Sequence, residues 1–167
     1  TSLVAAPACG APDTRIVTPQ GPRRLADLKA GDEVWSIHRG ELAIVPIAMA
    51  RRIPVANHEV VRVTLDGGAS FEMRAAHPLA DGRPVGALVP GDALGDRTVV
   101  EVSTVPYAFD ATYDIRPDSD SGTYFVLGVA LGSTIDGAQA EAAKTVARRV
   151  ARARMALAPE RTCRACS

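Results

Sequence analysis

The chain has 167 residues and a mass of 17.5 kDa, which suits one domain with a short appendage and excludes two large domains. Hydrophobic residues make up 47% and charged residues 23%, so the composition excludes a disordered or collagen-like chain. Residues 1–140 hold 12 Lys and Arg against 17 Asp and Glu, a net charge of −5, whereas residues 141–167 hold 7 against 2, a net charge of +5. The last stretch is therefore a segment of a different kind.

Residues 1–8 are expected to be an upstream segment, either the end of a larger preceding segment or the remainder of a removed signal peptide. The signal-peptide alternative would place the protein outside the cell or at its surface. The longest apolar runs, residues 42–50 and 124–132, have nine residues each, and a membrane-spanning helix needs about 20. We therefore expect no membrane span. The ratio of 17 Arg to 2 Lys is typical of a bacterial source with a GC-rich genome.

Short strand-like runs alternate with turn-forming residues up to about residue 122. The runs are rich in β-branched residues and too short for stable helices. Gly, Pro and Asp separate them, as at Asp66-Gly-Gly68. The sequence therefore predicts an all-β fold. The predicted strands are residues 15–18, 33–38, 60–65, 98–105 and 123–130.

Two segments that begin 60 residues apart, 25–34 and 85–94, share the pattern apolar-x-x-Leu-x-x-Gly-Asp-x-apolar. In each, a bent turn would lead into a Gly-Asp turn and then a strand. Gly31 and Gly91 would supply backbone angles that other residues resist. The pattern predicts an internal repeat, and two unrelated strand-entry turns are the alternative.

From Asp136 onward the apolar residues follow a helical period, at steps of three and four. Asp136 is the predicted N-cap, Gln139 its capping-box partner, and Pro159 the stop. A docking helix, a linker and a nucleic-acid-touching tail are alternatives, but a solvated helix packed on the domain is favoured. As a partner of this basic tail, residues 134–167, we expect another protein chain rather than nucleic acid. The helical stripe consists of Ala142, Val146, Val150, Ala153 and Leu157.

The chain has three cysteines, so at least one thiol is unpaired. Cys163 and Cys166 have the Cys-x-x-Cys spacing of redox and zinc sites, but zinc needs four ligands and the chain has no second pair. We therefore expect no metal and no cofactor, and interpret this pair as part of a disordered tail or of a site completed by another copy. The third cysteine, Cys9, requires a separate explanation.

Cys9 begins an ordered series of motifs. Thr14 follows five residues later, and then come a strand, a Gln-Gly turn and Leu-x-x-Gly-Asp-x-Val at residues 28–34. A second block ends in His77-Pro-Leu, and a third consists of two strand-like runs, of which the first contains Asp114 and the second spans residues 122–129. This series resembles the Hint superfamily, which includes inteins, Hedgehog autoprocessing domains and bacterial intein-like domains. The resemblance covers residues 9–133 and implies a β horseshoe with a pseudo-two-fold internal repeat.

The resemblance also implies a single-turnover reaction of the chain with itself. Cys9 would be the nucleophile that converts the Ala8–Cys9 peptide bond into a thioester, an N-to-S acyl shift. His77 would transfer protons, because an imidazole titrates near neutral pH, and Asp114 would assist as acid or base. Thr14 and residue 74 would support the scissile bond. Water, a thiol, an amine or an alcohol would then release the upstream polypeptide.

Four positions depart from the family pattern. Arg74 stands where inteins have a Thr three residues before the His, and Gly122 where they have a further His. Gly132 and Ser133 replace the His-Asn pair, and because Ser cannot form a succinimide we expect neither C-terminal cleavage nor splicing. An inactive scaffold that serves as a structural or binding module is therefore the alternative function.

Other roles remain open for some of these residues. Cys9 would otherwise be a lipid anchor or a buried inert cysteine, and Asp114 a hydrogen-bonding residue at a turn or strand end. His77 would otherwise be a structural histidine beside a turn proline. His38 and His58 have polar neighbours and are expected at the surface.

Overall fold

The computed structural model describes residues 9–157. Most of this stretch forms short strands, and one helix follows them. The all-β fold with a C-terminal helix is therefore confirmed. The elements are β1 (Arg15–Thr18), β2 (Gly21–Arg24), the 3-10 turn η1 (Leu25–Asp27), β3 (Glu33–His38), β4 (Glu41–Pro54), β5 (Glu59–Leu65), β6 (Ser70–Met73), η2 (Val85–Ala87), β7 (Ala93–Leu94), β8 (Arg97–Pro106), β9 (Ala111–Pro117), β10 (Tyr124–Val126), β11 (Val129–Leu131) and α1 (Gly137–Ala156).

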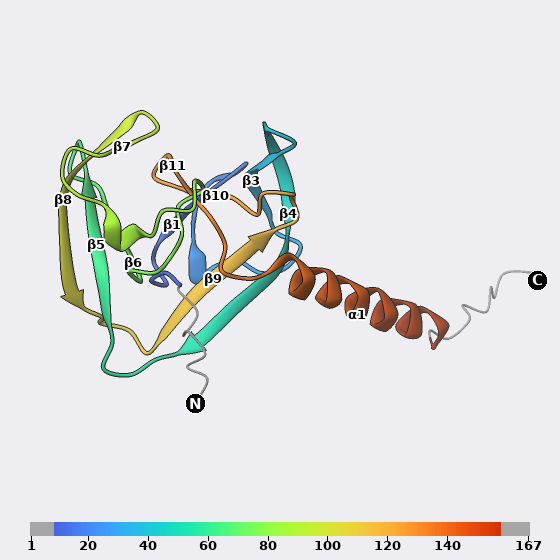
Figure 1. The fold of residues 1–167 in the computed structure, drawn as a ribbon. Helices are drawn as coiled ribbons and strands as arrows, with labels where there is room; N and C mark the ends of the chain where they lie inside the picture. Colours follow the sequence, from blue (N-terminus) through green and yellow to red (C-terminus); the bar gives the residue numbers. More distant parts are fainter. Residues whose placement is uncertain (1–8, 158–167) are drawn as a thin grey trace, which may run out of the picture.

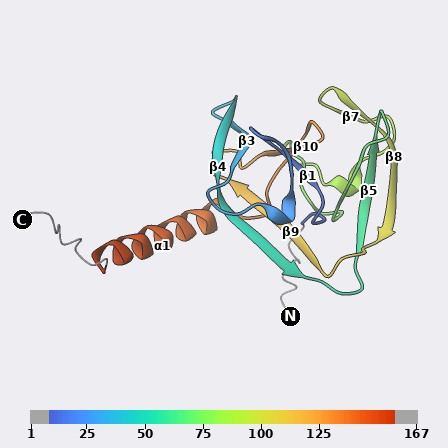
Figure 2. The same ribbon diagram turned by 180° about the vertical axis from the view of Figure 1, so that it is seen from behind.

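The strands of the described part form three sheets, with the orders β11-β10-β1-β2, β3-β4-β9 and β6-β5-β8-β7. Strand β4 lies on one side of the molecule and β5 and β8 on the other, with β1 and β10 between them and β9 running diagonally below these two (Figure 1). The long strands β4 and β8 each pair with two different neighbours along their length, which curls the sheets into an open horseshoe. Seen from behind, α1 projects away from this β body (Figure 2).

The two halves of the horseshoe contain the same turn. Gly31 and Gly91 have φ values of +93° and +95°, which glycine adopts at least cost. Their amides donate hydrogen bonds to Ile47 and Val99, at 2.9 and 2.8 Å. The carboxylates of the next residues, Asp32 and Asp92, each accept a hydrogen bond from the amide three residues earlier, at 3.0 and 2.9 Å. The predicted internal repeat is confirmed at the level of individual contacts.

Alternating side chains of the strands fill one core between the arms. Strand β9 is buried along most of its length, with β4 paired to one edge and Gly10 to the other. A carboxylate on this strand is therefore removed from water. Core residues from the different sheets include Ile16, Val34, Val63, Ile115, Val126 and Leu131.

Two segments differ from the sequence-based prediction. Residues 42–50 belong to β4, which no predicted strand covered. The run 123–130 is not one strand but the hairpin β10–β11, because Leu127 and Gly128 turn the chain with φ values of +51° and +80°. Leu rarely adopts a positive φ, so no local pattern indicated this turn.

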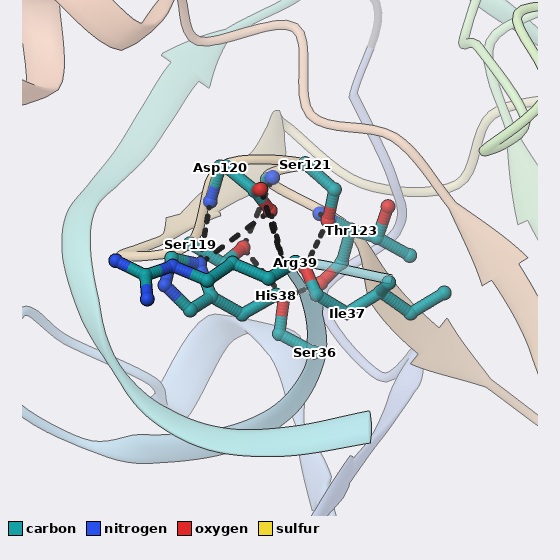
Figure 3. A network of polar contacts seen from close by, with 9 residues as sticks. Ser36, Ile37, His38, Arg39, Ser119, Asp120, Ser121 and Thr123 are labelled. Atoms are coloured by element: carbon teal, nitrogen blue, oxygen red, sulfur yellow. Dashed lines mark hydrogen bonds and ion pairs between the residues drawn. The ribbon is translucent and has the colours of Figure 1, made fainter. Parts of the chain in front are cut away.

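The loop between β9 and β10 is fastened to the β3–β4 hairpin, as Figure 3 shows. The hydroxyl of Ser36 donates to the Thr123 carbonyl at 2.6 Å, and the Arg39 amide donates to both carboxylate oxygens of Asp120 at 3.1 Å. The Asp120 amide in turn donates to Nδ1 of His38 at 3.1 Å. This network fixes the start of β10. His38 is half-exposed, as the surface prediction requires, whereas His58 packs against Tyr107 and its Nε2 is buried.

Helix α1 begins as predicted. The side chain of Asp136 accepts hydrogen bonds from the amides of Ala138 and Gln139, at 2.6 and 3.2 Å. Gln139 does not complete a capping box, because its side-chain oxygen instead accepts a hydrogen bond from Arg51. Only Ala140 is buried on the helix, and the stripe residues are exposed, so most of α1 is solvated. Between residues 9 and 157, no helix has the length and apolarity to cross a bilayer.

Candidate functional site

The chain enters the β body at Cys9 and Gly10. Gly10 lies between β6 and β9, where it exchanges two hydrogen bonds with Tyr113, of 2.8 and 2.9 Å, and bridges to Met73. A Cβ at Gly10 would lie 2.8 Å from the Met73 sulfur, so a larger residue there would require the Met73 side chain to move. The Cys9 carbonyl accepts a hydrogen bond from the Arg74 amide at 3.2 Å. These contacts hold Cys9 in the interior, with no exposed surface.

His77 lies in the segment after β6 and is fully buried. Its Nε2 is 2.9 Å from the Gly132 carbonyl oxygen and 3.1 Å from the Tyr124 hydroxyl. A carbonyl can only accept a hydrogen bond, so the network assigns the proton of the neutral ring to Nε2. The His77 amide donates to the Arg74 carbonyl at 2.9 Å, which places the two predicted residues in one turn.

Asp114, in β9, is buried and accepts hydrogen bonds at both carboxylate oxygens. Oδ1 accepts from the Tyr124 hydroxyl at 3.0 Å and from the Ile115 amide at 2.9 Å. Oδ2 accepts from the amide and the hydroxyl of Thr134, at 2.7 and 2.6 Å, and from the Ser133 hydroxyl at 3.3 Å. These donors supply the partners that a buried carboxylate requires.

Tyr124, which the sequence analysis did not single out, joins the two predicted polar residues. Its hydroxyl contacts His77 and donates to Asp114. Burial, followed by the Asp114 carboxylate, raises the pKa of Tyr124 well above its ordinary value, so the hydroxyl keeps its proton. The alternation of β10 indicates that Tyr124 faces inward with Val126, but the sequence contains no signal for its two polar partners.

The surroundings of Cys9 oppose ionisation of its thiol. Burial and, next, the charge of Asp114 raise the pKa of Cys9 to about 11. The hydroxyls of Thr112 and Thr134 and the charge of Arg51 act in the opposite direction. At neutral pH the sulfur is therefore a thiol, and a reaction at Cys9 requires a base to take its proton.

The remaining predicted residues contribute in other ways. Thr14 is buried, and its carbonyl accepts from the Leu25 amide at 2.8 Å, so its backbone shapes the entry to β1. Arg74 reaches Cys9 through its backbone amide, not through a hydroxyl as a Thr there would allow. Gly122 lies against the Arg116 guanidinium, which would be 2.4 Å from a Cβ at 122. Ala8, Cys163 and Cys166 lie outside the described residues.

The segment from Gly132 to Thr134, hereafter the strap, supplies the contacts that close the site. The sequence analysis noted Gly132 and Ser133 only as departures from a pattern. The strap's carbonyl and hydroxyl groups contact His77 and Asp114. Across residues 9–157, no group of three His, Cys, Asp or Glu side chains is arranged to hold a metal ion.

No family model matches the sequence. Warthog protein 1 of Caenorhabditis elegans is 29% identical over 72 residues, which are 42% of this chain and only 15% of that protein's length. The bacterial intein-like domain of Clostridium thermocellum superposes with a TM-score of 0.65 at 24% identity, covering 77% of this chain and 99% of that domain. A DnaB intein from Synechocystis gives a TM-score of 0.63 at 14% identity, covering 77% and 99%. These likenesses concern the fold.

Proposed function

We propose that this chain, whose fold is the Hint fold of inteins and bacterial intein-like domains, cleaves its own backbone before Cys9. The observation that carries the proposal is the convergence of three distant residues on one buried network. Cys9 lies beside Asp114, and Tyr124 connects Asp114 to His77. A structural role alone does not require a thiol, an imidazole and a carboxylate together in the interior.

The proposed reaction begins when Sγ of Cys9 loses its proton and attacks the carbonyl carbon of Ala8. The sulfur–carbon bond forms, the bond between that carbon and the Cys9 nitrogen breaks, and the nitrogen takes up a proton to leave as an amine. His77 is the proposed proton carrier, because its buried imidazole is linked through the Tyr124 hydroxyl to Asp114, which lies beside Cys9. The resulting thioester then passes to water, a thiol or an amine, which releases the residues up to Ala8.

The proposal stops at N-terminal cleavage or acyl transfer. Ser133 occupies the strap, where its hydroxyl donates to Asp114 at 3.3 Å, and it carries no amide that could cyclise. We therefore propose no peptide cleavage at the strap and no splicing.

The test is a fusion with a folded tag before Thr1, followed by intact mass with and without dithiothreitol. Cys163→Ser and Cys166→Ser are included in every variant, so that Cys9 is the only thiol. We expect cleavage between Ala8 and Cys9 that dithiothreitol accelerates and that Cys9→Ala abolishes. His77→Ala is expected to slow cleavage by at least about tenfold, since general acid–base catalysis contributes 10²–10⁴-fold in typical enzymes.

A second candidate function is an inactive Hint scaffold that acts as a structural or binding module. The pKa of about 11 at Cys9 and the absence of a hydroxyl at Arg74 favour it. A folded fusion that stays intact at every pH and thiol concentration would support this candidate and contradict autoprocessing. Arg74→Thr is then the first variant in which to look for cleavage.

A further inference from the structure

Arg51, Asp114 and Cys9 lie in a row across three neighbouring segments. Arg51 of β4 is the register partner of Asp114 in β9. On the other edge of β9, Gly10 pairs with Tyr113 in antiparallel orientation, so Cys9 is next to Asp114. Residues in register on adjacent strands present their side chains to the same face of a sheet.

The side chain of Arg52, the next residue in β4, lies on the opposite face of the sheet. Its Nε donates to the Tyr113 hydroxyl at 3.3 Å, and its Nη2 lies 3.6 Å from the Asp110 carboxylate. The two neighbouring arginines therefore have different surroundings, and only Arg51 shares a face with Asp114.

Helix α1 holds the Arg51 side chain. Nη2 of Arg51 donates to Oε1 of Gln139 at 2.6 Å. Gln139 is in the first turn of α1, which the Asp136 cap fixes and where Ala140 packs into the body. Lys144, one turn further on, pairs with Asp118 at 3.0 Å. The part of the helix that docks is therefore the part that contacts Arg51.

The charges around Cys9 are of both signs. After burial, which is the largest cause, Asp114 raises the pKa of the thiol, and Arg51 lowers it. His77, bonded to Tyr124, and Arg74, bonded to the Cys9 carbonyl, are further ionisable residues nearby. A guanidinium is charged at every pH at which a protein folds, so Arg51 is a permanent counter-charge.

We propose that Arg51 is a positioning residue that offsets the Asp114 charge at Cys9, and that α1 holds its guanidinium in place through Gln139. The proposal rests on the role of Cys9 as nucleophile. Negative charge that develops on the sulfur and then on the Ala8 carbonyl oxygen would otherwise face the Asp114 carboxylate without a counter-charge. The first turn of the basic helix thereby belongs to the reaction site.

The test compares Arg51→Gln and Gln139→Leu with the matched control Arg52→Gln, all lacking Cys163 and Cys166. The fraction of Cys9 thiolate is followed by ultraviolet absorbance against pH, as the difference from Cys9→Ala. We expect Arg51→Gln to move the titration to higher pH by a fraction of a pH unit, a loss of thiolate of less than about tenfold at a given pH. Gln139→Leu should move it less in the same direction, Arg51→Lys should keep it near the wild-type position, and Arg52→Gln should leave it unchanged.

A double-mutant cycle separates electrostatics from structural damage. If Arg51 offsets the Asp114 charge, Asp114→Asn and Arg51→Gln shift the Cys9 titration in opposite directions, and the double variant titrates between the two single variants. An equal shift in Arg52→Gln, no shift in Arg51→Gln, or a double variant that titrates no lower than Arg51→Gln would each overturn the proposal. The titration needs no cleavage, so a chain that never cleaves can still show the Arg51 effect. A failure of the proposed autoprocessing and a failure of the proposed Arg51 effect therefore give different results.

Discussion

The cysteine at the centre of the site is poorly ionised and fully buried. Its thiol has a pKa of about 11 because burial and, after it, the Asp114 carboxylate disfavour the thiolate. A thiol of this kind is a poor nucleophile until a base removes its proton. In the proposed reaction His77 is that base.

The raised pKa of Cys9 predicts a stability change at alkaline pH. The folded state holds the thiol proton up to about pH 11, whereas an unfolded thiol loses it near its ordinary value of 9.0. The contribution to folding stability is therefore fully present below pH 9 and is lost as the pH rises through 11. Relative to Cys9→Ala, the wild-type free energy of unfolding should fall by on the order of 2 kcal/mol between these limits.

Urea unfolding of both proteins at pH 8 and at the highest pH that both tolerate measures this difference. Cys163 and Cys166 are common to both chains, so their ionisation cancels in the comparison. An unfolding free-energy difference that does not change with pH would mean that the thiol ionises as readily in the fold as outside it.

At the scale of residues, the sequence indicated those that belong to a motif. Cys9, His77 and Asp114 each lie within an ordered block, and the structure brings them to one network. Tyr124 and Thr134 could not be found in this way, because their importance comes from hydrogen bonds to residues 10 and 20 positions earlier in the chain. A hydroxyl at a given position carries no local signal of the carboxylate that it contacts.

At the scale of elements, strands with β-branched alternation were predicted with bounds accurate to about one residue, as for β3 and β5. Strand β4 was not predicted. Its second half contains Arg51 and Arg52, and charged residues interrupt the apolar alternation that indicates a half-buried strand. The β10–β11 turn was hidden by its Leu127, an apolar residue in a left-handed conformation. Sequence patterns predict which side chains are buried and with what period. Strand β4 and the β10–β11 hairpin instead depend on which strands pair, which local patterns do not show.

The N-cap of α1 allows a test at this scale. Asp136→Ala removes the acceptor for two helix amides and should destabilise α1 by about 1 kcal/mol, seen as a smaller helical signal in circular dichroism. The melting temperature of the β body should change little, because α1 buries only Ala140 among the described residues. Glu141→Ala, which removes an exposed pair with Lys144, is the control and should have a smaller effect.

The outcome is informative in both directions. An equal loss of β-body stability in Asp136→Ala would show that helix and sheets unfold as one unit. The stability of α1 and that of the β body would then be coupled more strongly than the small buried surface between them indicates.

At the scale of the whole molecule, the internal repeat was visible in the sequence because both copies retain Gly and Asp in the same turn. The shared backbone conformation requires glycine, and the shared hydrogen bond requires a short carboxylate. The pairing of the long strands β4 with β9 and β8 with β5 was not visible in the sequence, because the partners come from distant parts of the chain.

The repeat predicts equal responses to equivalent substitutions. Asp32→Ala and Asp92→Ala each remove one hydrogen bond to a turn amide and should each lower the free energy of unfolding by about 1 kcal/mol. Asp32 should cost slightly more, because it also pairs with Arg23 and Lys29 at 3.7 Å. Chemical denaturation measures both, and Asp96→Ala, at an exposed position beside the second turn, is the control. A large effect at only one of the two positions would show that the equivalent hydrogen bonds contribute unequally to the free energy of unfolding.

The strap has a mechanical consequence. The three residues of the strap contact His77 and Asp114 and are followed closely by α1. This helix has 20 residues and is docked on the β body only near its start. Tension applied to the far end of α1, by a tether or by a bound chain, would first act on the contacts of Lys144 with Asp118 and of Gln139 with Arg51, and would then reach the strap. The backbone that contacts His77 in the proposed reaction is therefore the same backbone that connects the β body to α1.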